Sequence, residues 1–136
     1  MKPIREVIIP FYREALTVKS GVNPSEILNE LLADDFVSRG SVENKNKQAL
    51  IAQIGFFWKL VPDLKWTPQD LIVEGDKAVV RSEVTGTPSG NFMGVPTTGA
   101  KSFRFMTIDI HQVKEGRIHT VYHLEDWVTA IGQVKA

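Results

Sequence analysis

The hydrophobic pattern of this chain changes its period once, near Pro62. Before this point apolar residues recur at three- and four-residue steps, which is the spacing of one face of an amphipathic helix. After it, β-branched and aromatic residues dominate between turn sequences, which is typical of strands. Helices followed by antiparallel strands predict an α+β domain, with the helices packed on one face of a curved sheet.

Three helices are expected before Pro62. The first covers residues 4–18, where Pro10 either kinks the helix or marks a late start. The second begins after Pro24, with Ser25 as its cap, and the third begins near Asn46. The first half of the chain therefore supplies the helical layer.

The second half supplies the sheet. Turns at Glu74–Asp76 and Lys114–Arg117 predict two antiparallel hairpins, and Phe36 with Val37 predicts one brief earlier strand. Glycine and proline interrupt residues 86–99 too often for a continuous strand. We expect this stretch to be a shaped loop over one end of the sheet.

The strand at residues 101–113 carries apolar side chains on both faces. Phe103 and Phe105 point one way, whereas Met106, Ile108 and Ile110 point the other. Helices cover only one face of a sheet in a domain of this size. The second face is therefore predicted to form a subunit contact, most simply in a symmetric homodimer.

Composition restricts the partners. The 16 basic and 16 acidic residues give no net charge, so no overall field attracts nucleic acid or an anionic membrane. Cysteine is absent, which excludes disulfides and thiolate zinc sites. Residues 1–10 lack the features of a signal peptide, and no apolar run approaches the roughly 20 residues of a membrane span. We expect one cytoplasmic domain over residues 1–136.

An ordered set of short segments resembles a known family. The segments are Pro62-Asp63-Leu64, EGDKAVVR at 74–81, Gly86-Thr87, GVPTTG at 94–99, Gly116-Arg117-Ile118, Tyr122, Asp126 and Gln133. Their order and spacing, from about residue 11 to 133, resemble the SnoaL-like polyketide cyclases of the nuclear-transport-factor-2-like superfold. The resemblance implies a cone of helices and curved sheet around a pocket. It also implies ring closure by intramolecular aldol condensation without metal or organic cofactor, with Asp126 matching the family's acid/base aspartate.

Strand alternation places other residues around Asp126. If 118–124 is a strand, Tyr122 and Leu124 share a face with Asp126, while His123 and Glu125 share the opposite face. Tyr122 and Leu124 are therefore predicted to line the pocket. Two plainer interpretations stay open: Asp126 caps a helix that begins at Trp127, and Tyr122 only packs.

Aromatic and soft apolar side chains suit a flat hydrophobic ligand. The candidate substrate-binding residues, besides Tyr122 and Leu124, are Trp58, Phe92, Met93, Phe103 and Phe105. Phe92 and Met93 lie in the glycine-rich stretch and are predicted at the pocket mouth. The alternative for most of this set is an ordinary core.

The remaining ionisable residues suggest no metal. His119 and His123 would be roughly 13 Å apart along a strand, and His111 adds no ligand spacing. Asp109 and Glu83 fall within strands, so each is expected to face solvent or a cation such as Arg81 or Arg104. We assign these two acids structural roles.

The sequence thus predicts a cofactor-independent cyclase or isomerase-like enzyme that acts on a hydrophobic carbonyl compound, with Asp126 as general acid/base. A non-catalytic binding module is the alternative, because one fold serves many functions. A third hypothesis is a hydrolase or dehydratase in which a histidine beside Asp126 activates water. His123 is expected to point away, which disfavours it.

Overall fold

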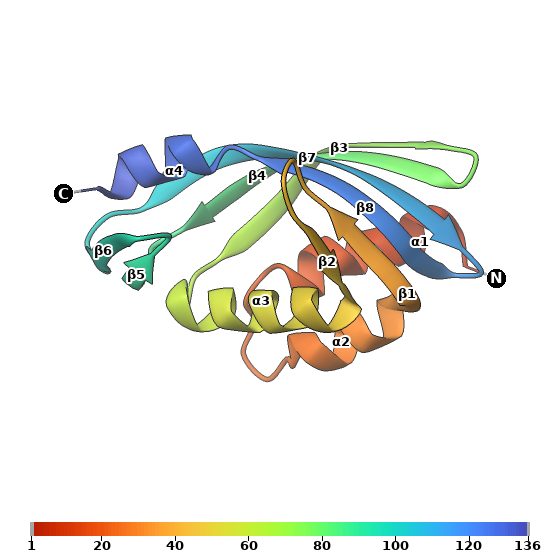
Figure 1. Cartoon of the computed structure of the whole chain (residues 1–136), viewed down its shortest axis with the longest axis horizontal. Helices are drawn as coiled ribbons and strands as arrows, with labels where there is room; N and C mark the ends of the chain where they lie inside the picture. The colour runs from red at the N-terminus through yellow and green to blue at the C-terminus, as the bar shows by residue number, and fades with distance from the viewer. Residues whose placement is uncertain (1, 136) are drawn as a thin grey trace.

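A computed structural model of the chain describes residues 2–135, which form a curved sheet with three helical segments on one face and a fourth helix at its end (Figure 1). The elements in chain order are α1 (Ile4–Pro10), η1 (Phe11–Ala15), α2 (Pro24–Leu31), β1 (Leu32–Arg39), β2 (Asn44–Asn46), α3 (Lys47–Leu60), β3 (Lys65–Glu74), β4 (Lys77–Gly86), β5 (Ser89–Phe92), β6 (Val95–Thr98), β7 (Phe103–Lys114), β8 (Arg117–Glu125) and α4 (Trp127–Val134). The predicted α+β class is confirmed.

The helices begin where side chains cap them. Helix α3 begins next to Asn46, as predicted, and the Asn46 side chain accepts a hydrogen bond from the Ala49 amide. Helix α2 is capped by Asn23 rather than Ser25, because the Asn23 side chain accepts from the Ser25 amide while Pro24 takes the first helical position. The first helix is continuous through Pro10 but widens afterwards into the π-helical turn η1.

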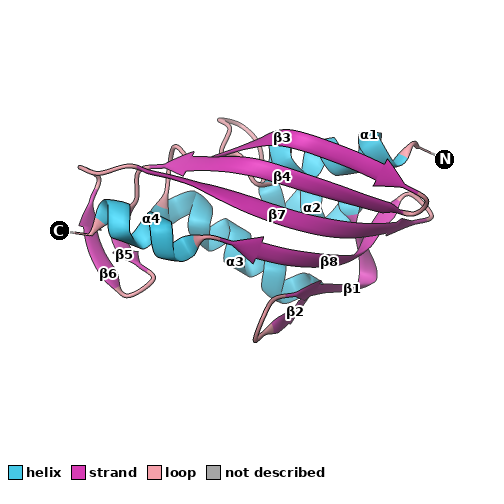
Figure 2. Cartoon of the chain, turned by 90° about the horizontal axis from the view of Figure 1, so that it is seen from above, coloured by secondary structure: helices cyan, strands magenta, loops and turns pink. Residues whose placement is uncertain are grey.

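The main sheet has the strand order β2-β1-β8-β7-β4-β3 (Figure 2). Its β3–β4 and β7–β8 pairs are the two predicted hairpins, and β1 runs parallel to its neighbour β8. Strand β1 is longer than the predicted Phe36–Val37. The stretch 86–99 is not only a loop, since β5 and β6 pair within it as a small hairpin of their own.

The two faces of β7 differ as the sequence predicts. Residues with odd numbers from Phe103 to Val113 are buried beneath the helices, and the alternate positions are more exposed. Met106, Ile108 and Ile110 lie on the open face of the sheet, next to Tyr122 and Leu124 of β8. No helix among residues 2–135 has the length and apolar character needed to cross a membrane.

Strand β8 contains one extra residue. In its pairing with β7, Val113 lies opposite Ile118, but Gln112 lies opposite Thr120, so His119 bulges out of the ladder. The bulge reverses the alternation of side chains beyond it. Ile118 points into the core, and so do Val121, His123 and Glu125 instead of Thr120, Tyr122 and Leu124.

Candidate active site

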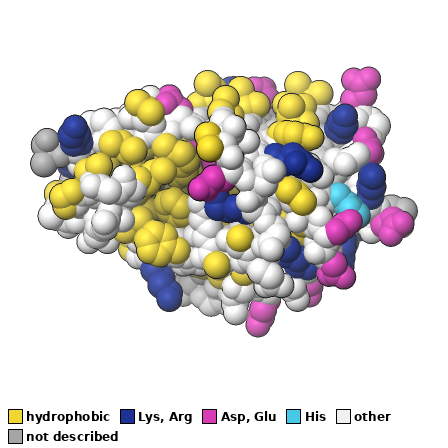
Figure 3. Space-filling model, in the orientation of Figure 1, with side chains coloured by type: hydrophobic (Ala, Val, Ile, Leu, Met, Phe, Trp, Pro, Cys, Tyr) yellow, Lys and Arg dark blue, Asp and Glu magenta, His cyan; other side chains and the backbone are white. Residues whose placement is uncertain are grey.

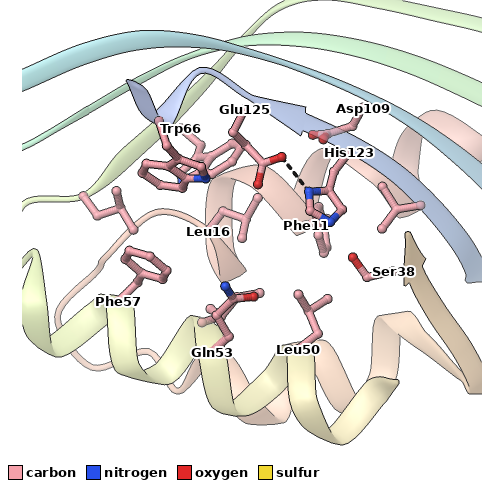
Figure 4. Close-up of a pocket in the computed structure, with 14 residues that line it drawn as sticks. Phe11, Leu16, Ser38, Leu50, Gln53, Phe57, Trp66, Asp109, His123 and Glu125 are labelled. Carbon is pink, nitrogen blue, oxygen red and sulfur yellow. Dashed lines mark hydrogen bonds and ion pairs between the residues drawn. The ribbon is translucent and has the colours of Figure 1, made fainter. Parts of the chain in front are cut away.

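A pocket of about 80 Å³ lies between the sheet and α3 (Figure 4). Most of its lining is apolar, and its polar groups come mainly from β7 and β8. The lining residues are Phe11, Leu16, Ser38, Leu50, Gln53, Ile54, Phe57, Leu64, Trp66, Asp109, Val121, His123, Glu125 and Trp127. In Figure 4, His123 and Glu125 point from the sheet toward Leu50 and Gln53 of α3.

His123 and Glu125 form a pair within the pocket. The His123 Nδ1 atom lies 2.6 Å from Glu125 Oε2. The two residues are separated by one position on β8, so their side chains share a face of the strand. The hydrogen bond to the Glu125 carboxylate raises the pKa of His123, and burial opposes this only in part. Glu125 thereby orients the imidazole and strengthens it as a base.

Asp109 is the second acidic group of the pocket. It is only 4% exposed and lies directly opposite His123 across the β7–β8 pair. Burial raises the pKa of Asp109 to about 7, although a hydrogen bond from the Tyr12 hydroxyl, 2.6 Å from Oδ2, works against this. Asp109 therefore gains and loses its proton near neutral pH, which is the range a general acid or base requires.

An aromatic wall borders the pocket near the start of α4. The Trp127 ring stacks on Phe57 with centroids 5.5 Å apart, and it packs against Phe105 at 4.6 Å. Figure 3 shows hydrophobic side chains gathered on this face between α4 and α3. The polar groups on the sheet are thus enclosed by surfaces suited to an apolar ligand.

The predicted position of Asp126 in the pocket is wrong. Its carboxylate caps α4, because Oδ1 accepts from the Thr129 amide at 3.2 Å and Oδ2 accepts from the Thr129 hydroxyl at 2.6 Å. Asp126 is exposed and does not line the cavity. The plainer interpretation, a helix cap, is the geometry observed.

Tyr122 and Leu124 also lie outside the pocket. They are 55% and 65% exposed on the open face of the sheet. Their prediction assumed unbroken alternation from Ile118, and the bulge at His119 reverses it. The same bulge turns His123 inward, so the expectation that His123 points away is wrong as well.

The other predicted binding residues lie outside the pocket lining. Phe92 is fully buried and packs on Phe103 and Trp127, while Phe105 contacts Trp127. Trp58 donates its indole N–H to the Ala15 carbonyl, 2.8 Å away. Met93 is 46% exposed at the β5–β6 turn. These five side chains support or flank the pocket, and none of them lines it.

Sequence reasoning missed three of the polar groups that matter. Asp109 was expected to have a structural role, facing either solvent or a cation, but it is buried and its partner is the Tyr12 hydroxyl. Glu83 does have a cation nearby, with Arg104 Nε 3.7 Å from its carboxylate. His123 and Glu125 were assigned to the wrong face. The signal for Asp109 was available, since it shares the buried alternation of Phe103 and Phe105, whereas nothing in the sequence marks the bulge.

No group of three or more His, Asp or Glu side chains within residues 2–135 has the arrangement of a metal site. The three histidine side chains lie in different surroundings. His111 is buried against Tyr12, His119 lies 3.2 Å from Asp35, and His123 lines the pocket.

Solved structures with the same fold cover almost the whole chain. IdmH from Streptomyces antibioticus, a candidate polyketide cyclase, has a TM-score of 0.83 and 29% identity over 97% of this chain and 98% of its own. TsrD from Streptomyces laurentii has a TM-score of 0.77 and 25% identity, covering 96% of this chain and 91% of its own. A SnoaL-like protein from Jannaschia sp. CCS1 has a TM-score of 0.85 at 21% identity, covering 100% and 96%, and shows the fold.

A comparison with curated proteins gave no match. The family pattern of the SnoaL-like polyketide cyclases matches residues 7–134, which is nearly the full length and includes every residue of the pocket. This match agrees with the resemblance of the short segments and with the helices packed on a curved sheet. The chain belongs to the SnoaL-like polyketide cyclase family.

Proposed function

We propose that the protein is a cofactor-independent cyclase or isomerase that acts on a hydrophobic carbonyl compound by acid/base chemistry. The observation that carries this proposal is the juxtaposition of Asp109 with the His123–Glu125 pair inside an apolar pocket. A proton acceptor with its own orienting carboxylate faces a carboxyl group that titrates near pH 7. Family membership supports the reaction class.

In the proposed reaction His123 removes a proton from the carbon beside a substrate carbonyl. The resulting carbanion attacks a second carbonyl of the same molecule, which forms a carbon–carbon bond and leaves an alkoxide. Protonated Asp109 then donates to the alkoxide, and the proton on His123 restores Asp109, so the protein ends unchanged. A positioned acid or base contributes about 10²–10⁴-fold in rate, and the remainder comes from holding the substrate folded.

The size of the cavity constrains how a substrate binds. A volume of about 80 Å³ is small beside the roughly 300–1,000 Å³ typical of pockets for drug-sized ligands. We propose that only the reacting carbonyl end of a substrate enters between Asp109 and His123. The rest would lie along the hydrophobic surface beside Trp127 and Phe57.

The test is proton exchange at carbon, because it needs no knowledge of the product. Small aryl ketones such as 2-tetralone are incubated with the protein in D₂O, and loss of the α-proton signal is followed by NMR. We expect wild-type protein to accelerate exchange over buffer. His123→Gln and Glu125→Gln should each reduce the acceleration by about 10²-fold or more.

Asp126→Asn is the matched control, since it removes a carboxylate one position beyond Glu125 but outside the pocket. Its exchange rate should equal that of wild type. Equal rates for buffer and wild-type protein would refute the acid/base proposal. If the ketones then still bind, seen as saturable NMR shifts, the non-catalytic binding module becomes the correct description.

We also propose that two copies associate through the open face of the sheet. Ile108 and Ile110 lie there directly opposite the exposed Leu124 and Tyr122 of the neighbouring strand, and Met106 is on the same face of β7. Contiguous apolar side chains of this kind are uncommon on a monomer surface. The partner in this proposal is a second copy of the chain, related by twofold symmetry.

A further inference from the structure

Behind Asp109 lies a buried chain of hydrogen bonds that the proposed reaction does not use. The Tyr12 hydroxyl is 2.6 Å from Asp109 Oδ2 and 2.6 Å from His111 Nε2. Tyr12 and His111 are both completely buried, and neither belongs to the groups that would touch a substrate, since neither lines the pocket. Asp109 thus links this buried pair to the cavity.

The unpaired Nδ1 atom of His111 sets the direction of the hydrogen bonds that run from His111 through Tyr12 to Asp109. His111 Nδ1 is buried and has no hydrogen-bond partner among the described residues. A buried N–H without an acceptor is costly, so the proton of the neutral ring belongs on Nε2. Burial lowers the pKa of His111 to about 3, which keeps the ring neutral. His111 Nε2 therefore donates to the Tyr12 oxygen, and the single Tyr12 proton is left for Asp109.

The backbone around Tyr12 holds this geometry. Tyr12 lies in the π-helical turn η1, which Pro10 precedes and which closes with the Leu16 amide donating to the Phe11 carbonyl at 3.0 Å. The Tyr12 carbonyl accepts from the Thr17 hydroxyl at 2.8 Å, and that same hydroxyl accepts from the Trp66 amide at 3.0 Å. Isolated π-helical turns are often found at functional sites.

Three aromatic rings surround the Tyr12 ring. Phe11 and His111 contact it edge-on, with centroids 5.3 Å and 5.7 Å away, and Trp66 lies at 6.2 Å. A tyrosine in such a setting has little rotational freedom, so its hydroxyl stays in one place. Fixed donors of this kind hold catalytic groups in position without reorganising during the reaction.

We propose that Tyr12, itself held by His111, is a positioning residue of this site: it fixes one carboxyl oxygen of Asp109 in the core and leaves the other for the pocket. The inference rests on the proposed role of Asp109 as acid. No hydrogen bond from residues 2–135 occupies Asp109 Oδ1, and Asp109 is among the residues lining the cavity. The hydrogen bonds from His111 to Tyr12 and from Tyr12 to Asp109 also keep the pKa of Asp109 close to neutral pH.

The charges around Asp109 give the sign of this effect. His123 and Glu125 face it from β8, Tyr12 from η1, and His111 follows on β7 itself. Burial and Glu125 favour the protonated carboxyl, whereas Tyr12 and His123 favour the carboxylate. Removal of the Tyr12 hydroxyl should therefore raise the pKa of Asp109 further.

The experiment is a ¹³C NMR titration of the Asp109 carboxyl in aspartate-labelled protein, with Asp109→Asn used for assignment. In Tyr12→Phe we expect the pKa of Asp109 to rise by roughly 1–2 units, and the pH profile of ketone exchange to move the same way. Tyr122→Phe is the control, because it removes the only other tyrosine hydroxyl, on the open face. An unchanged or lowered Asp109 pKa in Tyr12→Phe overturns the proposal.

Two further measurements complete the test. His111→Gln keeps a donor near the position of Nε2 and should preserve the Asp109 titration. His111→Leu removes that donor and should raise the pKa of Asp109. In wild-type protein, ¹⁵N NMR should find His111 neutral with its proton on Nε2, and a proton on Nδ1 overturns the proposal even if the variants do not fold. The titration decides the role of Tyr12 even if wild-type protein exchanges no ketone protons, an outcome that refutes only the proposed function.

Discussion

Asp109 on β7 lies directly opposite His123 on β8, and both side chains face the same pocket. Directly paired residues on one sheet face have Cβ atoms about 4.5–5.5 Å apart, so each group feels the charge of the other. Burial is the main cause that raises the pKa of Asp109, whereas the hydrogen bond to Glu125 is the main cause that raises the pKa of His123. The inner face of the sheet therefore holds a proton near neutral pH, inside a largely apolar enclosure.

Asp109→Asn should change how the free energy of unfolding depends on pH. Because the pKa of Asp109 is raised from 3.8 to about 7, the folded state retains a proton that the unfolded state loses, and stability falls as pH rises through this window. His111 acts oppositely, since its pKa is lowered from 6.5 to about 3 and stability is lost as pH falls. In wild type these two opposite pH dependences of the free energy of unfolding offset each other between about pH 4 and 6.5.

In Asp109→Asn only His111 still makes the free energy of unfolding depend on pH between about pH 4 and 6.5, so this free energy should rise with pH. The free energy of unfolding of the variant should exceed that of wild type by little near pH 4 and by on the order of 4 kcal/mol near pH 8. Urea unfolding at about pH 4, 6 and 8 measures this difference. Asp76→Asn, in an exposed turn, is the control. A gain that is independent of pH would contradict the assigned protonation of Asp109.

Glu125→Gln should lower the pKa of His123 toward its ordinary value. Glu125 is the main cause of the upward shift, through a 2.6 Å hydrogen bond, and the amide that replaces it carries no charge. Titration of the His123 imidazole by NMR checks this. Asp126→Asn should leave the same titration unmoved, because that carboxylate faces Thr129. A His123 pKa that is equal in wild type and Glu125→Gln would show that the pair is not formed.

Asp126→Ala should destabilise the protein without affecting ketone exchange. Loss of a helix N-cap costs about 0.5–2 kcal/mol, and here both carboxylate oxygens accept bonds from Thr129. Asp126→Ser, which keeps a capping oxygen, should recover most of the loss in urea unfolding. The opposite pattern, unchanged stability with lost exchange activity, would restore Asp126 as the acid/base residue that the family resemblance implies.

Leu124→Asp should convert the proposed dimer to a monomer. Leu124 lies opposite Ile108 on the open sheet face and is 65% exposed in a single chain, so a charge there costs little in the monomer and much in an apolar contact. Sedimentation equilibrium measures the change. Val42→Asp, at an exposed position away from this face, is the control. A wild-type protein that sediments as a monomer would rule out the contact.

The fold was predictable because its signals are local and repeated. Caps such as Asn46, the turn at Glu74–Asp76 and the alternation in β7 each depend on a few neighbouring residues. The order of family-like segments added the arrangement of helices and a curved sheet around a pocket. The parallel pairing of β1 with β8 was not predicted, because no local pattern contains it. The small hairpin within 86–99 was hidden because glycine and proline also mark turns within short strands.

The site was predicted less well than the fold, for one physical reason. Alternation along β8 is correct only within an unbroken ladder, and the extra residue at His119 shifts every later side chain to the opposite face. Tyr122, Leu124 and Asp126 were therefore placed inside and His123 outside. The tie between Tyr12 and Asp109 spans 97 positions, so only the folded structure brings these two groups together.

The bulge at His119 also means that β8 encodes two alternative inner surfaces in one sequence, offset by a single position. In one frame the helices meet His123 and Glu125, and in the other they would meet Tyr122 and Leu124. Deletion of one residue at the bulge would exchange the two faces of the strand beyond it, turning Tyr122 and Leu124 toward the helices and His123 and Glu125 toward the open face. Loss of one codon would therefore replace an inner sheet face that carries ionisable groups with one that is mainly apolar.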